Sequence, residues 1–243
     1  MRIARLDLGG VAAHVREDAG RWIPIEDPYV AMSAGRAPAD IGDAVDGVLL
    51  PPAAPTVVVG IAQNGPGHAS PVQAWLKSPR TLTASGRIVR LRRDAGTTVA
   101  EGEIAVVIGR DTSGLTAADA HLFVLGLTAV NDLSSPDRGA LDPRNFESKS
   151  GHGYTPLGPW IDASADIDTA TLTLAIDGVE RARTNSSELP VSIRECLAYV
   201  ASWTPLGPGD VVMTGAPHSS APVLPGEEMT VQVDGVRLVT PTL

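Results

Sequence analysis

Three acidic residues have the types and the spacing of a divalent-metal site. Glu101 and Glu103 lie one residue apart in the segment EGEIAVVIGR, and Asp132 ends the apolar segment LTAVND. Side chains two apart on a strand share a face, at roughly 6.6 Å between Cα atoms, so two such glutamates can hold one ion. Acids at alternate positions are also typical of the exposed face of an edge strand. Asp132 favours the metal site, because an acid at the end of an apolar strand is costly to bury without a cation or donors.

The ligand types indicate which ion such a site would hold. An all-oxygen set suits Mg²⁺ or Mn²⁺, whereas zinc favours His or Cys ligands. The ion would polarise a ketone and stabilise the enolate that forms when a neighbouring bond breaks. Lys149, in the polar segment ESKSGHGY, is a candidate for binding a substrate carboxylate, although lysines in such segments are commonly surface residues.

Composition sets limits on the partners. The 243 residues are 43% hydrophobic and 19% charged, which excludes a disordered chain. A net charge of −9 argues against nucleic acid or an anionic membrane as partner and favours a small molecule. The single cysteine, Cys196, excludes a disulfide framework. We expect a cytoplasmic protein. The start of the chain alternates apolar and polar residues, unlike a signal peptide, and no apolar run approaches the ~18 residues that span a bilayer.

The order of secondary-structure signals predicts a small N-terminal module followed by a larger domain. Residues 1–50 contain strand patterns at 2–8 and 12–16, joined by a turn at Gly9-Gly10. The proline-rich connector that begins at Pro51 marks the predicted boundary, so that residues 51–243 form the catalytic domain.

Within the larger domain, the patterns predict mostly strands. Strands are expected at 56–61, 88–91, 103–108 and 127–132, and hairpins at Asp177-Gly178 and Asp234-Gly235. Two helices are expected, one over 116–125 with a capping pattern and a terminal glycine, the other over 190–203. The Gly- and Pro-rich segment 64–71 is expected to be a loop after the first of these strands.

Four motifs occur in one order along residues 51–243 and together resemble the fumarylacetoacetate hydrolase family. They are EGEIAVVIGR, LGLTAVNDLS, SKSGHGYTPLGPWI and LGPGDVVMTGAP. The resemblance implies a mixed α/β fold that is mostly β, a mixed β-roll preceded by a variable small module. It also implies a homodimer, bound Mg²⁺ or Mn²⁺, and action on 2-oxo acids or β-dicarbonyl compounds.

The resemblance also assigns residues to roles. Glu101, Glu103 and Asp132 match the family's metal ligands, and Lys149 matches its active-site lysine. Two further matches concern substrate contact: Thr214 and Gly215 correspond to a TGTP-like turn, and Asn64 begins the family's catalytic loop.

Two departures from the family bear on the reaction. In the family loop a His and a Glu together activate water; here His68 is present, but Pro71 occupies the Glu position. A histidine without a carboxylate to orient it is a poorer general base. After Asp132 the family has an arginine before an aspartate, whereas this chain has Pro136-Asp137, so Arg138 or Arg144 would have to take that role.

These observations predict a metal-dependent enzyme that cleaves a carbon–carbon bond, by hydrolysis or decarboxylation, through a metal-stabilised enolate. His68 and Lys149 are the predicted catalytic residues. Loss of the loop Glu weakens hydrolysis more than decarboxylation, which needs no activated water. Two alternatives remain: a keto-enol or double-bond isomerase with the same metal, and a catalytically silent relative that acts as a binding or subunit-partner protein.

Overall fold

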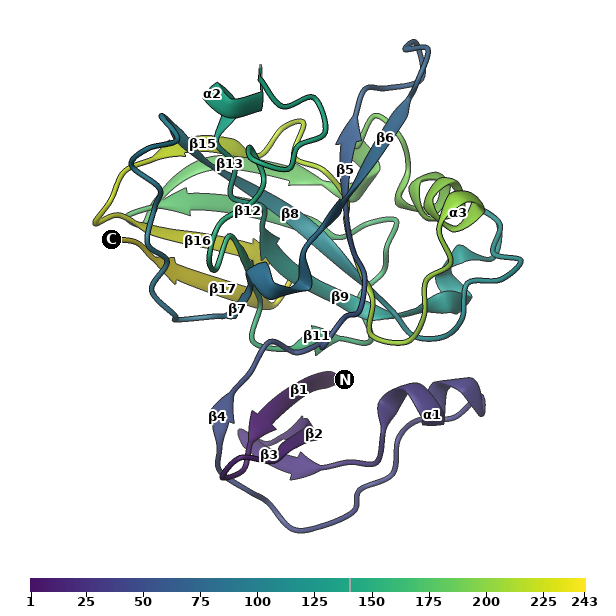
Figure 1. Ribbon diagram of the computed structural model, residues 1–243. Coiled ribbons are helices and arrows are strands. Elements are labelled where there is room, and N and C mark those ends of the chain that lie inside the picture. The colour runs from purple at the N-terminus through teal and green to yellow at the C-terminus, as the bar shows by residue number, and fades with distance from the viewer. Residues whose placement is uncertain (140) are drawn as a thin grey trace.

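Strand β8 (Thr98–Ile108) runs through the larger of two sheets and carries both glutamates of the predicted metal site. It pairs antiparallel with β9 (Val124–Asn131) on one side and β14 (Val211–Met213) on the other. The computed structural model describes residues 1–139 and 141–243, and its mostly β architecture confirms the predicted fold class. Figure 1 shows β8 and β9 crossing the centre of the molecule.

The larger sheet follows the order β3-β2-β1-β11-β9-β8-β14-β5-β6, with short strands β4, β7, β10 and β15 paired beside this path. The remaining bounds are β1 (Arg2–Asp7), β2 (Ala12–Asp18), β3 (Arg21–Pro24), β4 (Val48–Leu49), β5 (Val58–Gln63), β6 (Val72–Lys77), β7 (Leu82–Ala84), β10 (Thr155–Leu157), β11 (Ile161–Asp162) and β15 (Ser220–Val223).

The smaller sheet contains four antiparallel strands in the order β13-β12-β16-β17. Its bounds are β12 (Thr171–Ile176), β13 (Val179–Asn185), β16 (Glu228–Val233) and β17 (Val236–Pro241), and both predicted hairpins are confirmed. Asp177 and Gly178 have φ of 48° and 75°, the left-handed conformation that a two-residue hairpin turn of this type requires at both positions.

The two faces of β8 have different roles. A Cβ atom on Gly102 would lie 3.4 Å from Leu174 of the smaller sheet, so this face packs against that sheet in the main core. Ala105 belongs to a second buried cluster on the opposite face. Because Glu101 and Glu103 alternate with Gly102 and share the parity of Ala105, they lie on the face directed away from the smaller sheet.

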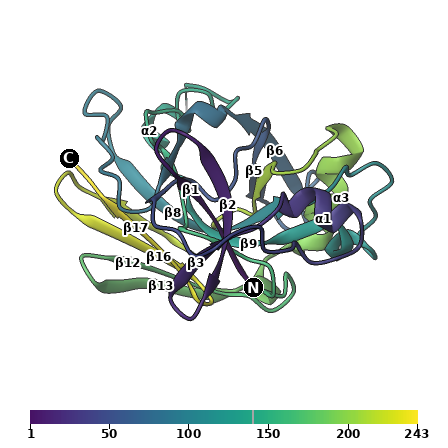
Figure 2. The same cartoon turned by 90° about the horizontal axis from the view of Figure 1, so that it is seen from below.

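The N-terminal strands extend the larger sheet through the pairing of β1 with β11. Helix α1 (Pro28–Ser33) follows them; the Asp27 side chain accepts hydrogen bonds from the backbone N–H groups of Tyr29 and Val30 at 2.8 and 3.1 Å and so caps it. Figure 2, seen from below, has these strands in front of the sheets. The domain boundary near Pro51 stays a prediction.

The helix predicted over 190–203 is confirmed as α3 (Ile193–Trp203), which begins after a capping box formed by Ser192 and Glu195. Its buried residues Ile193, Leu197 and Val200 join the main core. The other helices of the described residues are short: α2 (Pro136–Gly139) and the 3₁₀ turns η1 (Pro79–Thr81), η2 (Ala120–Phe123) and η3 (Ser186–Glu188).

The helix predicted over 116–125 is wrong. Asp119 accepts hydrogen bonds from the backbone N and the hydroxyl of Thr116, at 2.7 and 2.8 Å, but this closes only a turn before η2. Strand β9 begins at Val124 and includes Gly126, whose Cβ would lie 2.4 Å from the carbonyl oxygen of Asp162. The glycine therefore allows close approach of β11 and does not end a helix.

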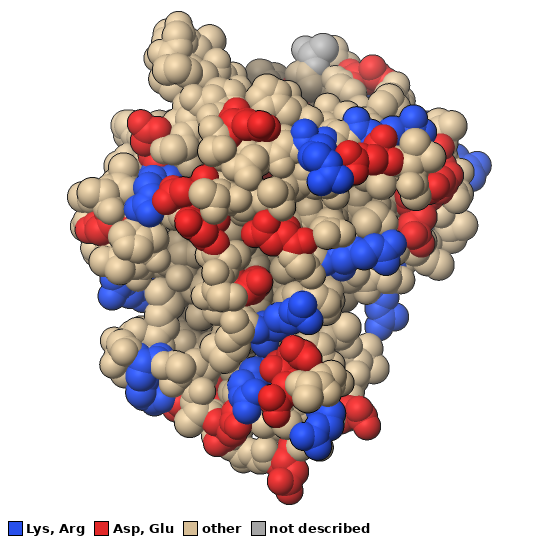
Figure 3. Space-filling view, turned by 180° about the vertical axis from the view of Figure 1, so that it is seen from behind, with Lys and Arg blue, Asp and Glu red and all other residues tan. Residues whose placement is uncertain are grey.

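The strand predicted over 88–91 is also wrong in extent. Val89 forms an isolated parallel bridge with Thr242, and its N–H donates to Pro241 at 2.9 Å. The described residues include no helix that is both long and apolar enough to cross a membrane. On the face seen from behind, Figure 3 shows acidic and basic side chains intermixed.

Candidate active site

The β8–β9 pairing brings the three predicted metal ligands together. Gly102 lies opposite Asn131, and the backbone N–H of Asp132 donates to the carbonyl oxygen of Glu101 at 2.8 Å. One carboxylate oxygen each of Glu101, Glu103 and Asp132 lies within 4.8 Å of the others. The pairing thus brings the two glutamates of β8 close to the aspartate that follows β9. Their role as metal ligands remains a prediction.

Glu103 is a buried carboxylate that lies close to two other acids. Burial, and next the charge of Asp132, raise the pKa of Glu103 well above its usual value. The backbone N–H of Gly215 donates to its Oε2 at 2.7 Å, which offsets only part of this effect. A buried carboxylate in this situation is stabilised by an added cation.

Lys149 places its ammonium group among these acids. It donates to Oδ2 of Asp132 at 2.8 Å and also contacts Oε2 of Glu101. Burial alone would lower the pKa of Lys149, but the charges of Asp132, Glu101 and Glu103 outweigh it and raise that pKa. The predicted site lysine therefore lies beside the acidic cluster rather than on the surface.

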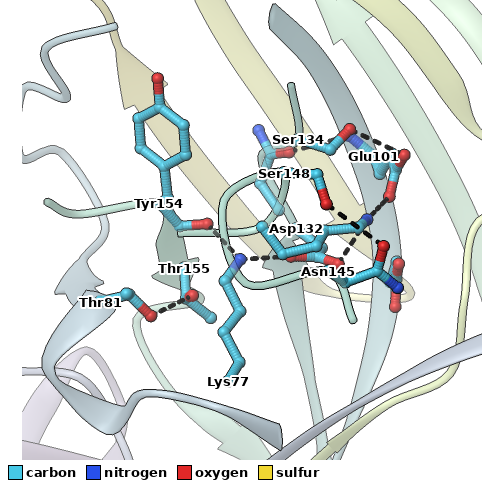
Figure 4. Close-up of polar contacts among 12 residues, drawn as sticks. Lys77, Thr81, Glu101, Asp132, Ser134, Asn145, Ser148, Tyr154 and Thr155 are labelled. Atoms are coloured by element: carbon cyan, nitrogen blue, oxygen red, sulfur yellow. Dashed lines mark hydrogen bonds and ion pairs between the residues drawn. The ribbon is translucent and has the colours of Figure 1, made fainter. Parts of the chain in front are cut away.

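A second lysine, which the sequence analysis did not identify, completes the cluster. Lys77 at the end of β6 is buried; it contacts Oδ1 of Asp132 and donates to the carbonyl oxygen of Tyr154 at 2.8 Å (Figure 4). Burial lowers its pKa despite the neighbouring Asp132. The available signal was its place in the alternating segment VQAWLK, on the same side of the strand as Trp75, but the pattern alone does not reveal burial.

The cluster has the donor chemistry of a hard-cation site. Burial would raise the pKa of Asp132, but Lys149 and Lys77 outweigh it and hold the pKa below its usual value. With every group charged, three carboxylates and two ammonium groups leave one net negative charge. Three oxygen ligands at this separation suit Mg²⁺ or Mn²⁺. The residues therefore fit a divalent cation.

The segment MTGAP forms the wall beside Glu103. Gly215 has φ of +86°, and a Cβ atom there would lie 2.7 Å from the carbonyl oxygen of Ile61, so the turn requires glycine. The Thr214 hydroxyl donates to the carbonyl oxygen of Ile104 at 3.0 Å, and the Thr214 carbonyl accepts from Gln63 at 2.9 Å. These bonds hold the turn, and substrate contact by Thr214 and Gly215 stays a prediction.

A pocket of about 300 Å³ opens onto the cluster. Glu101, Glu103 and Lys149 line it together with Trp75, whose ring lies 5.2 Å from the Lys149 ammonium in a cation–π arrangement. Trp75 pairs across the hairpin with Gly60, where a Cβ atom would lie 2.4 Å from the indole. The glycine gives the ring the space it occupies between β5 and the pocket.

The structure does not bring His68 and Asn64 to this pocket. Both lie in the exposed loop between β5 and β6, whose hairpin projects from the body of the molecule in Figure 1. His68 Nδ1 lies 2.9 Å from the carbonyl oxygen of Ser70, and Asn64 donates to that same oxygen at 2.9 Å. Their catalytic and substrate-binding roles remain predictions.

Comparison with known proteins identifies the family. The fumarylacetoacetate (FAA) hydrolase C-terminal family matches residues 53–242. A bifunctional isomerase/decarboxylase of 4-hydroxyphenylacetate degradation from Salmonella dublin is 32% identical over 171 residues, covering 68% of this chain and 40% of that protein. The chain thus spans about two fifths of that relative's length. A maleylpyruvate hydrolase from Aquipseudomonas alcaligenes is 29% identical over 71% of this chain and 60% of that protein.

A solved structure supports the assignment over the whole chain. The 5-carboxymethyl-2-hydroxymuconate delta-isomerase from Mycobacterium smegmatis has a TM-score of 0.89 and 28% identity, covering 100% of this chain and 99% of that one. Because the match covers the whole chain, it includes the N-terminal strands and both sheets. The chain belongs to the fumarylacetoacetate hydrolase family.

Proposed function

We propose that the protein is a divalent-metal-dependent enzyme that breaks a carbon–carbon bond in a 2-oxo acid or β-dicarbonyl substrate. The observation that carries the proposal is the convergence of Glu101, Glu103 and Asp132 beside a pocket that Lys149 also lines. Mg²⁺ or Mn²⁺ fits these ligands, and the bound ion would supply a Lewis acid that polarises the 2-oxo group and stabilises the developing enolate.

The residues of the chain would bind and orient the substrate. Lys149 would move its ammonium to the carboxylate adjacent to the 2-oxo group, which adds a charge-assisted hydrogen bond. Lys77 would remain on Asp132 and hold that carboxylate in position, because its second bond goes to the Tyr154 backbone. The walls formed by Ile61 and Trp75 would limit the access of water.

Decarboxylation and hydrolysis make different demands on this pocket. For oxaloacetate, decarboxylation breaks the bond between C3 and its carboxylate; carbon dioxide leaves, the bonding electrons remain on the enolate, and C3 takes a proton to give pyruvate. Hydrolysis of an acylpyruvate instead adds water to the acyl carbonyl and needs a base to remove the water's proton. His68 does not line the described pocket and Pro71 carries no carboxylate, which favours decarboxylation.

An isomerase is the second candidate. An isomerase would form its enolate by removing a C–H proton from the substrate instead of breaking a carbon–carbon bond, and return of the proton to a different carbon gives a shifted double bond with the carbon skeleton unchanged. Two of the similar proteins favour this possibility, one an isomerase/decarboxylase and the other a delta-isomerase. Proton exchange into the substrate from deuterated water without loss of carbon would distinguish it from cleavage.

Proton NMR of product formation tests the proposal. We expect pyruvate from oxaloacetate faster than the Mg²⁺ background, loss of that rate in EDTA, and loss of most of it in Glu103→Gln. Glu147→Gln is the matched control, because Glu147 is exposed and pairs with Arg138 outside the cluster. An acylpyruvate that yields pyruvate and a free acid, with loss in His68→Gln, would identify hydrolysis instead. Full activity of Glu103→Gln, or of protein in EDTA, would contradict the metal-dependent proposal.

A further inference from the structure

The side chain of Gln63 lies at the end of β5, beside the turn formed by the segment MTGAP. Strands β5 and β14 pair in parallel, with Met213, the last residue of β14, opposite Gly60, so that β5 continues alongside this turn. Gln63 also lines the candidate active-site pocket. Its side chain is therefore placed between the turn and the pocket.

Hydrogen bonds to Val191 fix the orientation of the Gln63 amide. Oε1 accepts from the backbone N–H of Val191 at 3.0 Å, and Nε2 donates to the carbonyl oxygen of the same residue at 3.3 Å. Because a backbone N–H can only donate, Oε1 must face it, and Nε2 supplies the donors. The shortest bond from Nε2, at 2.9 Å, goes to the carbonyl oxygen of Thr214. Gln63 thus links the segment before α3 to the turn.

The Thr214 carbonyl belongs to the peptide group whose N–H binds Glu103. The Gly215 N–H donates to Oε2 of Glu103 at 2.7 Å, and this bond is buried. The peptide is trans, and a trans peptide points its C=O and its N–H in opposite directions. The peptide therefore lies between Gln63 and Glu103, with one partner on each side.

Glycine makes the orientation of this peptide easy to reverse. Gly215 has φ of +86°, and glycine adopts positive and negative φ about equally readily. Rotation about the bonds on either side of a peptide that precedes glycine can turn it over, as between type I and type II turns. Thr214 itself is fixed, because its N–H and its hydroxyl both donate to the carbonyl oxygen of Ile104, at 3.1 and 3.0 Å. Among the described residues, the peptide that follows is bound by Gln63 and Glu103.

We propose that Gln63 is a positioning residue of the metal site: it holds the peptide before Gly215 so that its N–H binds Oε2 of Glu103 and Oε1 stays available to the cation. This inference rests on the proposed function, because it assigns Glu103 to a divalent cation. Loss of a group that orients a metal ligand typically weakens metal binding by about 10- to 100-fold.

Gln63→Met tests the proposal, since it keeps the length of the side chain and removes its donor. Amide hydrogen exchange, followed by NMR in EDTA, measures the orientation of the peptide without metal or turnover. The readout is the exchange rate of the Gly215 N–H divided by that of the Thr214 N–H, which Ile104 binds. We expect this ratio to rise at least about tenfold in Gln63→Met, the effect of one lost hydrogen bond to a charged group.

Binding of Mn²⁺ supplies the second readout. Electron paramagnetic resonance of free Mn²⁺ during titration should show a dissociation constant about tenfold higher in Gln63→Met than in the wild type.

Thr112→Val is the matched control. Thr112 likewise binds both backbone groups of one residue, since its hydroxyl accepts from the N–H of Leu206 at 3.0 Å and donates to the Leu206 carbonyl oxygen at 3.3 Å. It is not among the described residues that line the pocket. The variant should lose stability in urea unfolding, as Gln63→Met does, but keep the wild-type exchange ratio and the wild-type Mn²⁺ dissociation constant.

An unchanged exchange ratio in Gln63→Met, or a raised ratio with an unchanged Mn²⁺ dissociation constant, would overturn the role of Gln63 and leave the proposed function standing. Equal weakening of Mn²⁺ binding in Thr112→Val would do the same, because the effect would then follow from lost stability. A wild-type protein that binds no Mn²⁺ would overturn both proposals, since the positioned carboxylate would have no cation to bind.

Discussion

The ammonium nitrogen of Lys149 lies 2.8 Å from Oδ2 of Asp132, and the same ammonium contacts Glu101. The lysine therefore uses oxygens of two of the three carboxylates that are proposed to hold the divalent cation. An ammonium and a dication cannot share these oxygens at bonding distance without strong repulsion. Binding of the cation would then direct Lys149 away from the acids and toward the pocket, where the substrate carboxylate is expected.

Lys149→Met should therefore tighten metal binding while it slows turnover. Removal of a positive charge beside the site lowers the repulsion felt by a dication, and we expect the Mn²⁺ dissociation constant to fall by at least about tenfold. Electron paramagnetic resonance of free Mn²⁺ during titration measures this directly. Arg181→Met, on the exposed strand β13, controls for the loss of one positive charge at a distance. Weaker Mn²⁺ binding by Lys149→Met would show that the lysine supports the metal site instead of competing with it.

Lys77→Met should destabilise the protein, most strongly without metal. The change removes a buried ammonium and leaves Oδ1 of Asp132 and the Tyr154 carbonyl without this donor, while Lys149 still donates to Oδ2 of Asp132. Loss of one partner of a buried ion pair costs about 3–5 kcal/mol of unfolding free energy. Urea denaturation with EDTA and with Mg²⁺ measures the effect, and the added cation should recover part of the loss. An unchanged midpoint in EDTA would mean that Asp132 is compensated by other groups.

Gly60→Ala should displace Trp75 from its place beside the pocket. The new Cβ atom would lie 2.4 Å from the indole ring, so the ring or the strand must move. Overpacking of this kind costs about 1–3 kcal/mol, and the displaced ring would also lose its contact with the Lys149 ammonium. Gly42→Ala is the control, since its Cβ would meet only Pro24 at 3.7 Å. Equal urea midpoints for the two variants would show that the ring moves at no cost.

Sequence patterns predicted the elements whose signals are local. The Asp177-Gly178 hairpin and the capped helix α3 depend on turn chemistry and on an apolar face within one short segment, and both were found where expected. The helix predicted over 116–125 depended on the same kind of local signal. It failed because Val124 onward pairs with β8, a strand outside the segment, and this tertiary pairing overrides the local helix signal.

The candidate site shows the same division between local and distant information. The spacing of Glu101 and Glu103 places them on one face of a strand, and Asp132 follows the paired strand, so the acids were identifiable from sequence. Lys77 was missed because its burial depends on the position of Asp132 and Tyr154, which are far from it in the chain. The position of His68 outside the pocket likewise follows from the length and direction of a hairpin that composition does not specify.

Asp210→Ala should destabilise the connection between the predicted boundary and the catalytic domain. The buried Asp210 carboxylate accepts from the backbone N–H groups of Thr56, Val57 and Gly207 at 2.8–3.0 Å. These donors are partly buried, and a fully buried donor left without a partner costs about 1–3 kcal/mol, so we expect a total loss of about 2 kcal/mol or more. Asp119→Ala, which removes bonds to Thr116 at a partly exposed turn, should lose about 1 kcal/mol. Denaturant unfolding that ranks the two variants equally would contradict this role of Asp210.

The N-terminal strands should become less stable as the pH falls below about 6.5, the usual pKa of histidine. The ring of His14 packs edge-on against Tyr29, at 5.8 Å between centroids. Burial lowers the pKa of His14; the charge of Asp27 opposes this effect and the charge of Arg5 adds to it. The unfolded chain then binds the proton more readily. The contribution of neutral His14 to stability is therefore fully present above the pKa that His14 has in the unfolded chain. It decreases as the pH falls toward the lower pKa that His14 has in the folded protein.

Urea unfolding of the wild type, His14→Gln and His218→Gln at pH 7.5 and pH 5.5 isolates this contribution. His218 is exposed and serves as the control for loss of one histidine. We expect the decrease in unfolding free energy between the two pH values to be smaller in His14→Gln than in the wild type, and unchanged in His218→Gln. A decrease of equal size in all three proteins would assign the pH dependence to other groups, whereas a larger decrease in His14→Gln would mean that protonated His14 stabilises the fold.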